Sequence, residues 1–215
     1  MSVVAGFWRW GLAGLWLGLG LVGCGSGDGA YPPIVDNFAD IRTDGGGQMV
    51  SLSLDDGDSF SITNRLEVSS YRPDTVYRVV AGYTLEGKAA TLYRLSPVAV
   101  LGDSTGCAKH DPVGVVGVWL GGGYVNLHLV AMTHHSRPHF VGFACDSVAV
   151  AGEGRVHSTT HISLHHDQNG DPVSFSANAY CSIRRDGIGV WRCAGDTLCI
   201  RVCTFDGDRV WRFVR

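Results

Sequence analysis

The chain has 215 residues, of which 45% are hydrophobic and 17% are charged, and its formal net charge is −3 at pH 7. This balance favours a packed globule over a disordered chain, and the length suits one large or two small domains. The sequence shows no basic run that could neutralise phosphates, which excludes nucleic acid as an expected partner.

The N-terminal segment has the pattern of a bacterial lipoprotein signal peptide. Arg9 is the only charged residue among the first 23, and an apolar run follows over residues 10–22. This run is too short to span a bilayer, which takes about 20 apolar residues. It ends in Leu21-Val22-Gly23-Cys24, with the small residues and cysteine of a cleavage site. We therefore predict a signal peptide over residues 1–23 and a lipidated Cys24; the alternative is an uncleaved N-terminal anchor.

Lipidation of Cys24 predicts a tether to a lipid bilayer. Each buried methylene of an acyl chain contributes about 0.8 kcal/mol to membrane binding, so two or three chains anchor a folded domain stably. Residues 24–35 are rich in Gly, Ser and Pro and are typical of a flexible linker. Position 25 is Gly rather than the Asp of an inner-membrane retention signal, which favours the outer membrane. Whether the protein faces the periplasm or the outside is left open.

Residues 36–103 contain five short β-type runs separated by turn residues. These runs cover 48–54, 59–63, 76–85, 89–95 and 98–101. In the first run Val50, Leu52 and Leu54 alternate with Met49 and two serines, which predicts that Met49 lies on the polar face. Five short strands hide their edges best by closing on themselves, so we predict a small barrel of the oligonucleotide/oligosaccharide-binding (OB) type.

Residues 104–215 contain about seven further β-type runs. They cover 112–120, 124–130, 140–145, 156–165, 173–183, 197–204 and 210–214. This count with regular turn spacing predicts an antiparallel β-sandwich. No stretch after Cys24 shows a sustained 3.6-residue apolar period, so little helix is expected. The predicted fold is therefore all-β, with an OB-like barrel domain at 36–103 and a β-sandwich domain at 104–215.

Six cysteines follow Cys24, an even number in a compartment where disulfides persist. Six cysteines allow 15 pairings, and the sequence does not choose among them. Only the pair Cys199 and Cys203 is excluded, because on one strand their Cα atoms would lie about 13 Å apart, beyond the roughly 7 Å limit for a disulfide. The alternative is that several of the six are small buried thiols.

Several short motifs occur along residues 36–215, among them Asp56-Gly57-Asp58-Ser59-Phe60, Tyr77-Arg78-Val79, Asp111-Pro112-Val113, Gly123-Tyr124-Val125-Asn126-Leu127 and Gly170-Asp171-Pro172. These motifs and the order of the segments resemble the NigD-like lipoproteins of Bacteroidetes. The resemblance covers most of residues 36–215. It implies an N-terminal OB-type barrel and a C-terminal β-sandwich, and the bacteriocin operon of the original member implies an immunity role. It supplies no catalytic residues.

The run Gly102-Asp103-Ser104-Thr105-Gly106 satisfies the G-x-S-x-G pattern of a nucleophile elbow. An elbow needs a helix directly after the serine, whereas here the chain leads into another β-type run. We interpret the motif as a polar loop between the two domains, and we predict no catalytic residue.

Nine histidines raise the question of a metal site. His134, His135 and His139 are weak candidates for a site on a loop, because neither Cys-x-x-Cys nor His-Glu-x-x-His accompanies them. On a strand, His161 and His165 would lie about 13 Å apart, too far to share a zinc ion. The simpler interpretation is histidines bonded to neighbouring backbone, so no metal and no cofactor are predicted.

A calcium-loop pattern is also incomplete. Asp167, Asn169 and Asp171 stand at its first, third and fifth positions, but Asn178 stands at the twelfth, where the pattern needs Glu. The step Asn169-Gly170 between two β-type runs predicts a hairpin turn instead.

Trp119 and Tyr124 lie beside three glycines and are candidates for an exposed aromatic platform that stacks on sugars. The alternative is that both rings fill the core of the sandwich. The acidic residues Asp55, Asp56 and Asp58 predict a solvated turn rather than paired catalytic carboxylates.

Taken as a sequence, the chain is expected to be an envelope lipoprotein with a non-enzymatic binding or assembly role, whose partner is an envelope protein or a glycan. The alternative is an immunity or inhibitor protein that sequesters a toxin. A hydrolase acting on envelope polymers is a third hypothesis, and it requires a pocket that gathers an acid/base pair or an activated nucleophile.

Overall fold

The computed structural model describes residues 33–215 apart from 65, 67, 105–108, 152–156 and 190. The predicted signal peptide, Cys24 and most of the predicted linker lie outside the described residues. All the described residues belong to one compact unit. Within this part of the chain, no helix is long and apolar enough to cross a bilayer.

The described chain folds into β-strands, with one short 3-10 helix, η1 (Arg185–Gly187). The first five strands are β1 (Val35–Thr43), β2 (Met49–Leu54), β3 (Ser59–Ile62), β4 (Val76–Glu86) and β5 (Ala89–Pro97). The others are β6 (Ala99–Leu101), β7 (Gly114–Gly121), β8 (Tyr124–Thr133), β9 (Phe140–Ala151), β10 (His157–Asp167), β11 (Phe175–Arg184), β12 (Thr197–Thr204) and β13 (Gly207–Val214). The predicted all-β class is confirmed.

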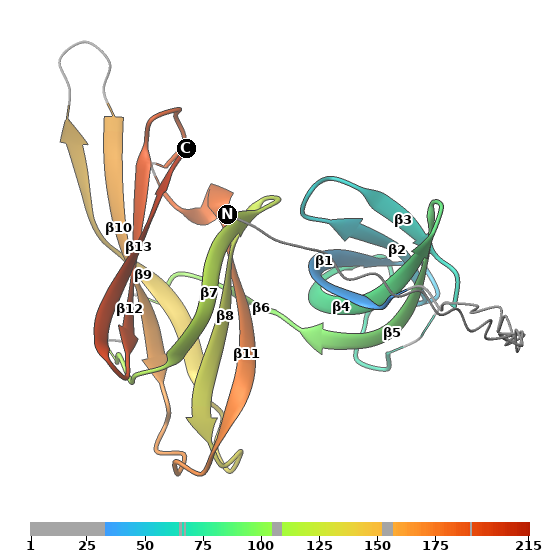
Figure 1. Ribbon diagram of the computed structural model, residues 1–215, viewed down its shortest axis with the longest axis horizontal. Coiled ribbons are helices and arrows are strands. Elements are labelled where there is room, and N and C mark those ends of the chain that lie inside the picture. The colour runs from blue at the N-terminus through green and yellow to red at the C-terminus, as the bar shows by residue number, and fades with distance from the viewer. Residues whose placement is uncertain (1–32, 65, 67, 105–108, 152–156, 190) are drawn as a thin grey trace, which may run out of the picture. The chain divides into compact units, whose positions relative to one another are not determined.

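Strands β1 to β5 form a closed barrel in the order β1-β2-β3-β5-β4 (Figure 1). The barrel closes because β1 pairs with both β2 and β4, and because β3 and β5 pair in parallel. The interior contains the apolar side chains of Ile41, Leu52, Ile62, Tyr83 and Leu92. The predicted small barrel and its two hairpins, β2–β3 and β4–β5, are confirmed.

The predicted alternation along β2 is wrong at its start. Met49 is completely buried, although the pattern placed it on the polar face. The cause is a bulge: Arg42 pairs with Ser51 and Thr43 pairs with Met49, which leaves Val50 without a partner on β1. One extra residue in a strand reverses the side to which the preceding side chains point.

The short run 98–101 was expected as the last barrel strand, and this is wrong. Its strand, β6, pairs in parallel with β11 of the sandwich. The pairing of β1 with β4 has already closed the barrel, so no free edge remains for a sixth strand. The edge of β11 is the available partner.

The C-terminal part is a sandwich of two four-stranded sheets, β13-β12-β10-β9 and β6-β11-β8-β7. Most neighbouring strands are antiparallel, and each sheet contains one parallel pair, β10–β12 and β6–β11. The fully buried side chains between the sheets include Val125, Leu127, Ile183, Trp191 and Ile200. The predicted sandwich is confirmed.

The described cysteines are all free thiols: Cys145, Cys181, Cys193, Cys199 and Cys203. Cys107 lies outside the described residues. Cys199 and Cys203 share β12, as the argument against their pairing assumed. Cys181 and Cys199 are buried, which fits the small-thiol alternative, and burial raises the pKa of Cys181 to about 12.

Candidate functional site at the barrel–sandwich junction

A buried arginine on the barrel marks the junction with the sandwich. On β4, Val79 and Ala81 point into the barrel, so Arg78 and Val80 point outward. The Arg78 side chain is nevertheless only 2% exposed. Its guanidinium lies 2.7 Å from an Asp55 oxygen and 3.3 Å from an Asp40 oxygen. Burial raises the pKa of Asp40, and the nearby Arg78 charge offsets part of this effect.

The sandwich supplies the remaining partners of this arginine. Arg78 Nη2 donates to Asn126 Oδ1 at 3.0 Å, and Arg78 Nε lies 3.4 Å from Ser182 Oγ. Asn126 Nδ2 in turn donates to Asp55 at 2.8 Å. Asn126 and Ser182 are fully buried on β8 and β11. One network of charge-assisted hydrogen bonds therefore joins the two domains.

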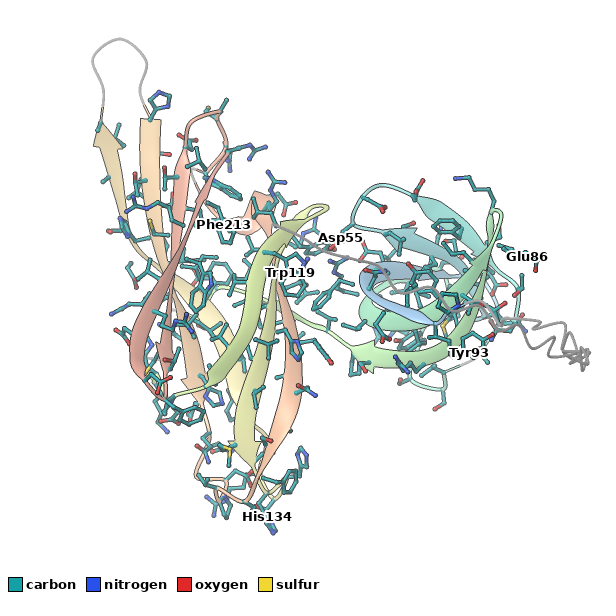
Figure 2. All side chains as sticks on the ribbon, viewed as in Figure 1. Asp55, Glu86, Tyr93, Trp119, His134 and Phe213 are labelled. Atoms are coloured by element: carbon teal, nitrogen blue, oxygen red, sulfur yellow. The ribbon has the colours of Figure 1, made fainter. Side chains whose placement is uncertain are left out.

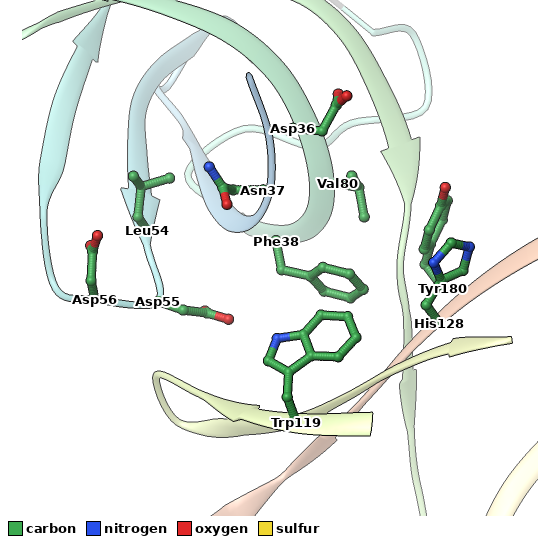
Figure 3. Close-up of a pocket in the computed structure, with 10 residues that line it drawn as sticks. All are labelled: Asp36, Asn37, Phe38, Leu54, Asp55, Asp56, Val80, Trp119, His128 and Tyr180. Atoms are coloured by element: carbon green, nitrogen blue, oxygen red, sulfur yellow. The ribbon is translucent and has the colours of Figure 1, made fainter. Parts of the chain in front are cut away.

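Next to this network lies a cavity of about 550 Å³, the junction cavity. It is lined by aromatic, acidic, amide and aliphatic side chains from β1, β2, the β2–β3 turn and β4 of the barrel and from β7, β8 and β11 of the sandwich. They are Asp36, Asn37, Phe38, Leu54, Asp55, Asp56, Val80, Trp119, His128 and Tyr180. Figure 3 shows the Phe38 ring next to the Trp119 indole, with the Asp55 side chain pointing toward them.

The aromatic rings of the junction cavity hold one another in fixed orientations. Phe38 meets Trp119 edge to face at a centroid distance of 5.1 Å, and it meets Tyr180 similarly at 5.9 Å. Tyr180 also contacts the His128 ring at 4.7 Å. Preoriented rings offer apolar faces without a further loss of side-chain entropy on binding.

Two carboxylates of the cavity are already engaged by guanidinium groups. Asp36 accepts two hydrogen bonds from Arg94, and Asp55 accepts from Arg78 and Asn126. These contacts fix both carboxylates as hydrogen-bond acceptors at the cavity wall. The prediction of a solvated turn is therefore wrong for Asp55, because its oxygens bind partners on two other strands.

The structure separates the two predicted ligand-binding residues. Trp119 lines the junction cavity, whereas Tyr124 lies under the Arg78 guanidinium at 4.1 Å and borders a different pocket. Both rings are half-buried outside the sandwich core, contrary to the core-packing alternative. On β7 it is Val118 and Leu120, on either side of Trp119, that pack on that core.

The histidine candidates for a metal site do not converge. Figure 2 shows His134 at the end of the sandwich remote from Trp119. The His135 ring packs against Phe175, and His139 Nδ1 lies 3.0 Å from His166 Nε2. Across the described residues, no group of three or more His, Cys, Asp or Glu side chains is arranged to hold a metal ion.

Asp171 instead organises the loop between β8 and β9, which carries His134, His135 and His139. Its carboxylate accepts hydrogen bonds from the backbone of residues 134–137 and from the hydroxyls of Thr133 and Ser136. Burial alone would raise the pKa of Asp171, but these hydrogen bonds outweigh burial and hold it far below its usual range. The predicted turn is present, because Asn169 and Gly170 both have positive φ. It is not a hairpin turn, since β10 and β11 belong to different sheets.

Residues 102–104 are bound to the sandwich, so the prediction of an interdomain loop is wrong for them. Ser104 N donates to Phe143 O at 2.8 Å, and Phe143 N donates to Gly102 O at 3.3 Å. The Ser104 hydroxyl donates to the same Phe143 carbonyl and lies 3.1 Å from His165 Nδ1. The rest of the motif, residues 105–108, lies outside the described residues.

Sequence reasoning missed the junction network. Arg78 and Asn126 stand among mostly apolar residues of β4 and β8, and this was the available signal, whereas Ser182 lies on a strand with several other polar residues. A polar residue at such a position predicts a buried polar contact. It does not identify the partner, because the partners lie 48 to 104 residues apart in the chain.

Comparisons with known proteins agree with this architecture. The family model described as "NigD-like C-terminal beta sandwich domain" matches residues 96–213. A NigD-like immunity protein from Bacteroides caccae has a similar structure, with 22% identity and a TM-score of 0.64 over 86% of this chain and 98% of that chain. A putative toxin-related protein from Parabacteroides distasonis gives 17% identity and a TM-score of 0.64 over 85% and 93%.

A putative lipoprotein from Bacteroides fragilis gives 9% identity and a TM-score of 0.61 over 85% of this chain and 98% of that chain. The comparison with curated proteins gives no match. At these identities the structural similarities concern the fold alone. The family model, in contrast, matches more than half of the sequence. The chain therefore belongs to the NigD-like family, with its C-terminal β-sandwich domain extending from the end of β5 to β13.

Proposed function

We propose that this chain is a membrane-tethered envelope lipoprotein that binds a glycan or a partner protein, without catalysis, in the junction cavity. The observation that carries the proposal is the lining of that cavity. Preoriented aromatic rings and fixed carboxylates face the same space of about 550 Å³. Stacking surfaces combined with a few acceptors are the usual composition of a ligand pocket.

The state of the carboxylates supports binding rather than hydrolysis. Glycoside hydrolysis needs one carboxyl group that donates a proton and a second that acts as base or nucleophile. Asp36 and Asp55 are each bonded to an arginine, and each carboxylate can accept further hydrogen bonds from ligand hydroxyl or N–H groups. This arrangement orients a ligand.

The proposal of a lipid tether is based on the sequence around Cys24 and on the short apolar run before it. The similar structure from Bacteroides fragilis is named a putative lipoprotein, which agrees with this assignment. The proposed linker follows the acylated cysteine and ends before Val35, where β1 of the barrel begins. The outer membrane is the proposed location.

A glycan array and an envelope extract, each exposed to the immobilised chain without its signal peptide, test the binding role. Retention of a specific glycan or protein is expected, and it should be lost in Trp119→Ala and Tyr180→Ala, which remove two walls of the cavity. Tyr93→Ala is the matched control, because Tyr93 is an exposed ring on β5 outside the cavity. Retention that survives both cavity substitutions, or no retention at all, rejects the proposal.

An immunity function is the second candidate. It is favoured by two similar structures, one named a NigD-like immunity protein and one a putative toxin-related protein. In this case the ligand of the junction cavity is a segment of a toxin. Deletion of the gene should sensitise the host to that toxin, and Trp119→Ala should fail to restore protection. Unchanged sensitivity in the deletion strain removes this candidate.

A further inference from the structure

A second pocket, of about 1050 Å³, is rich in arginine and separate from the junction cavity. We call it the arginine pocket. It is bordered by the β7–β8 turn, by η1 and the loop after it, by the end of β13, and by β1 and β4 of the barrel. Its charged lining side chains are Asp40, Arg184, Arg185, Asp186, Arg192 and Arg215. The four guanidinium groups outnumber the two carboxylates, although the whole chain is acidic.

Three of these arginines have no carboxylate partner among the described residues. Arg184 pairs with Asp186 at 2.8 Å, but no ion pair involves Arg185, Arg192 or Arg215 in that part of the chain. Among the described residues, the guanidinium group of each of the three donates only to a backbone carbonyl. The acceptors are Gly122 O at 3.3 Å, Gly189 O at 2.8 Å and Trp191 O at 2.9 Å, respectively. A guanidinium has five N–H groups, so each retains donors for a ligand.

A buried tryptophan holds two of these guanidinium groups in place. The Trp191 ring is fully buried, and Arg185 and Arg215 lie 5.0 Å and 5.8 Å from its centroid. Cation–π contact together with a carbonyl bond restricts each side chain. When a ligand binds, Arg185 and Arg215 therefore lose less side-chain entropy than unrestrained surface arginines would lose.

The backbone below the pocket is also fixed. The Asp196 carboxylate accepts hydrogen bonds from the backbone N–H groups of Ser158, Arg192 and Cys193 at 2.6 to 3.0 Å. Trp191 Nε1 donates to the Asp196 carbonyl at 3.1 Å. The backbone of the loop that carries Arg192 is therefore tied to β10.

We propose that the arginine pocket binds an oxyanion, a phosphate or carboxylate group carried by an envelope ligand. Planar guanidinium groups match the geometry of both anions through paired N–H donors. Tyr124 borders the pocket and adds a half-buried aromatic side chain to its lining. Neither Trp119 nor Tyr180 lines this pocket, so the site is independent of ligand binding in the junction cavity.

Titration of the chain without its signal peptide, followed by NMR, tests this site with three probes: inorganic phosphate, glucuronate, and vesicles containing phosphatidylglycerol. We expect dissociation constants of roughly 1 mM or tighter for at least one probe. Arg185→Gln and Arg192→Gln should each weaken binding about tenfold, because each removes a charged donor. Binding of the soluble probes identifies a phosphate or carboxylate on a soluble ligand, whereas binding of vesicles alone identifies a lipid headgroup.

Arg212→Gln is the charge-matched control, since Arg212 is exposed on β13 outside the pocket. It should leave binding unchanged, and Trp119→Ala should also leave it unchanged. The proposal is overturned if no probe binds, or if Arg212→Gln weakens binding as much as the two pocket substitutions. Higher salt should weaken specific binding, because the interaction is between charges.

Discussion

At the residue scale, Arg78 is the side chain that distinguishes this junction from an ordinary surface contact. A buried cation is tolerated only when its charge and its N–H groups are satisfied. Asp40 and Asp55 supply the charge, and Asn126 supplies a neutral acceptor from the sandwich. Because the acceptors come from both domains, the arginine is satisfied only when barrel and sandwich are together.

Arg78→Ala should therefore be strongly destabilising. It leaves the carboxylates of Asp40 and Asp55, which are 30% and 19% exposed, without their cation. Loss of one partner from a fully buried ion pair costs about 3–5 kcal/mol, and the partial exposure of the two carboxylates places the expected cost at about 3 kcal/mol or less. Urea unfolding followed by tryptophan fluorescence measures the change. The exposed Arg94→Ala is the control and should change the free energy of unfolding much less. A value for Arg78→Ala near that of the control contradicts the role assigned to the network.

Asp171 makes the stability dependent on pH in the acid range. Its pKa is below the usual range in the folded protein, so the unfolded chain binds more protons in acid. The contribution is present above the unfolded pKa of about 3.9 and is lost as the pH falls below it. Asp171→Asn should lower the unfolding midpoint at pH 7 and flatten its decline between about pH 5 and pH 2.

Thermal unfolding across this pH range measures the effect. Asp206→Asn, which changes an exposed carboxylate in the β12–β13 turn, is the control and should follow the unsubstituted protein. Parallel pH profiles for Asp171→Asn and the unsubstituted protein would show that the carboxylate does not hold the loop.

At the scale of the element, most strands were predictable, but β1 was missed and the partners with which the strands pair were not predictable. Apolar runs between turn residues located most strands, including the β7–β8 hairpin at the three glycines. The side to which Met49 points depended on a bulge opposite β1, and the sheet to which β6 belongs depended on the closure of the barrel. The first outcome depends on Arg42 and Thr43 across the β1–β2 turn, and the second depends on β11, far away in the chain, so the pattern of one strand contains no information about either.

Substitutions at the β7–β8 turn test how closely the sandwich approaches Asp55 of the barrel. A Cβ atom at Gly121 would collide with Asp55 and lie 2.8 Å from Asn126 Nδ2. Gly121→Ala should therefore displace Asp55 from Arg78 and lower the unfolding midpoint in a thermal scan. Gly123→Ala, two residues away, meets nothing within 4 Å and should have a small effect. Equal effects of the two substitutions contradict the close approach.

At the scale of the whole molecule, the NigD-like chain combines a closed barrel, a sandwich and a proposed lipid anchor. The barrel and the sandwich have separate apolar cores, and their contact is polar and aromatic. Such a junction leaves cavities where two curved surfaces do not fit tightly, and domain interfaces are frequent places for ligand sites. Both proposed sites border the contact between the domains.

Cys24→Ser in the full-length chain tests the anchor. Without the thiol no acyl chain can be attached, and the protein should move from the membrane fraction to the soluble fraction of its host. Fractionation and immunoblotting measure this shift, and mass spectrometry of the unsubstituted protein should find an acylated Cys24 at the N-terminus. A substituted protein that stays in the membrane fraction contradicts the anchor.

The sequence by itself determined most strands other than β1, the barrel-and-sandwich class and the family resemblance, because period-2 patterns, turn residues and short motifs are local properties. Only the tertiary structure decided that Trp119 and Tyr124 belong to different pockets, and that Arg78 is buried. It also decided that four arginines from η1, its flanking residues and the end of β13 surround one space. The membership of each pocket and the burial of Arg78 depend on which side chains meet when the sheets pack. Contacts between residues of different strands follow from the packing of the whole fold rather than from the order of residues in any one segment.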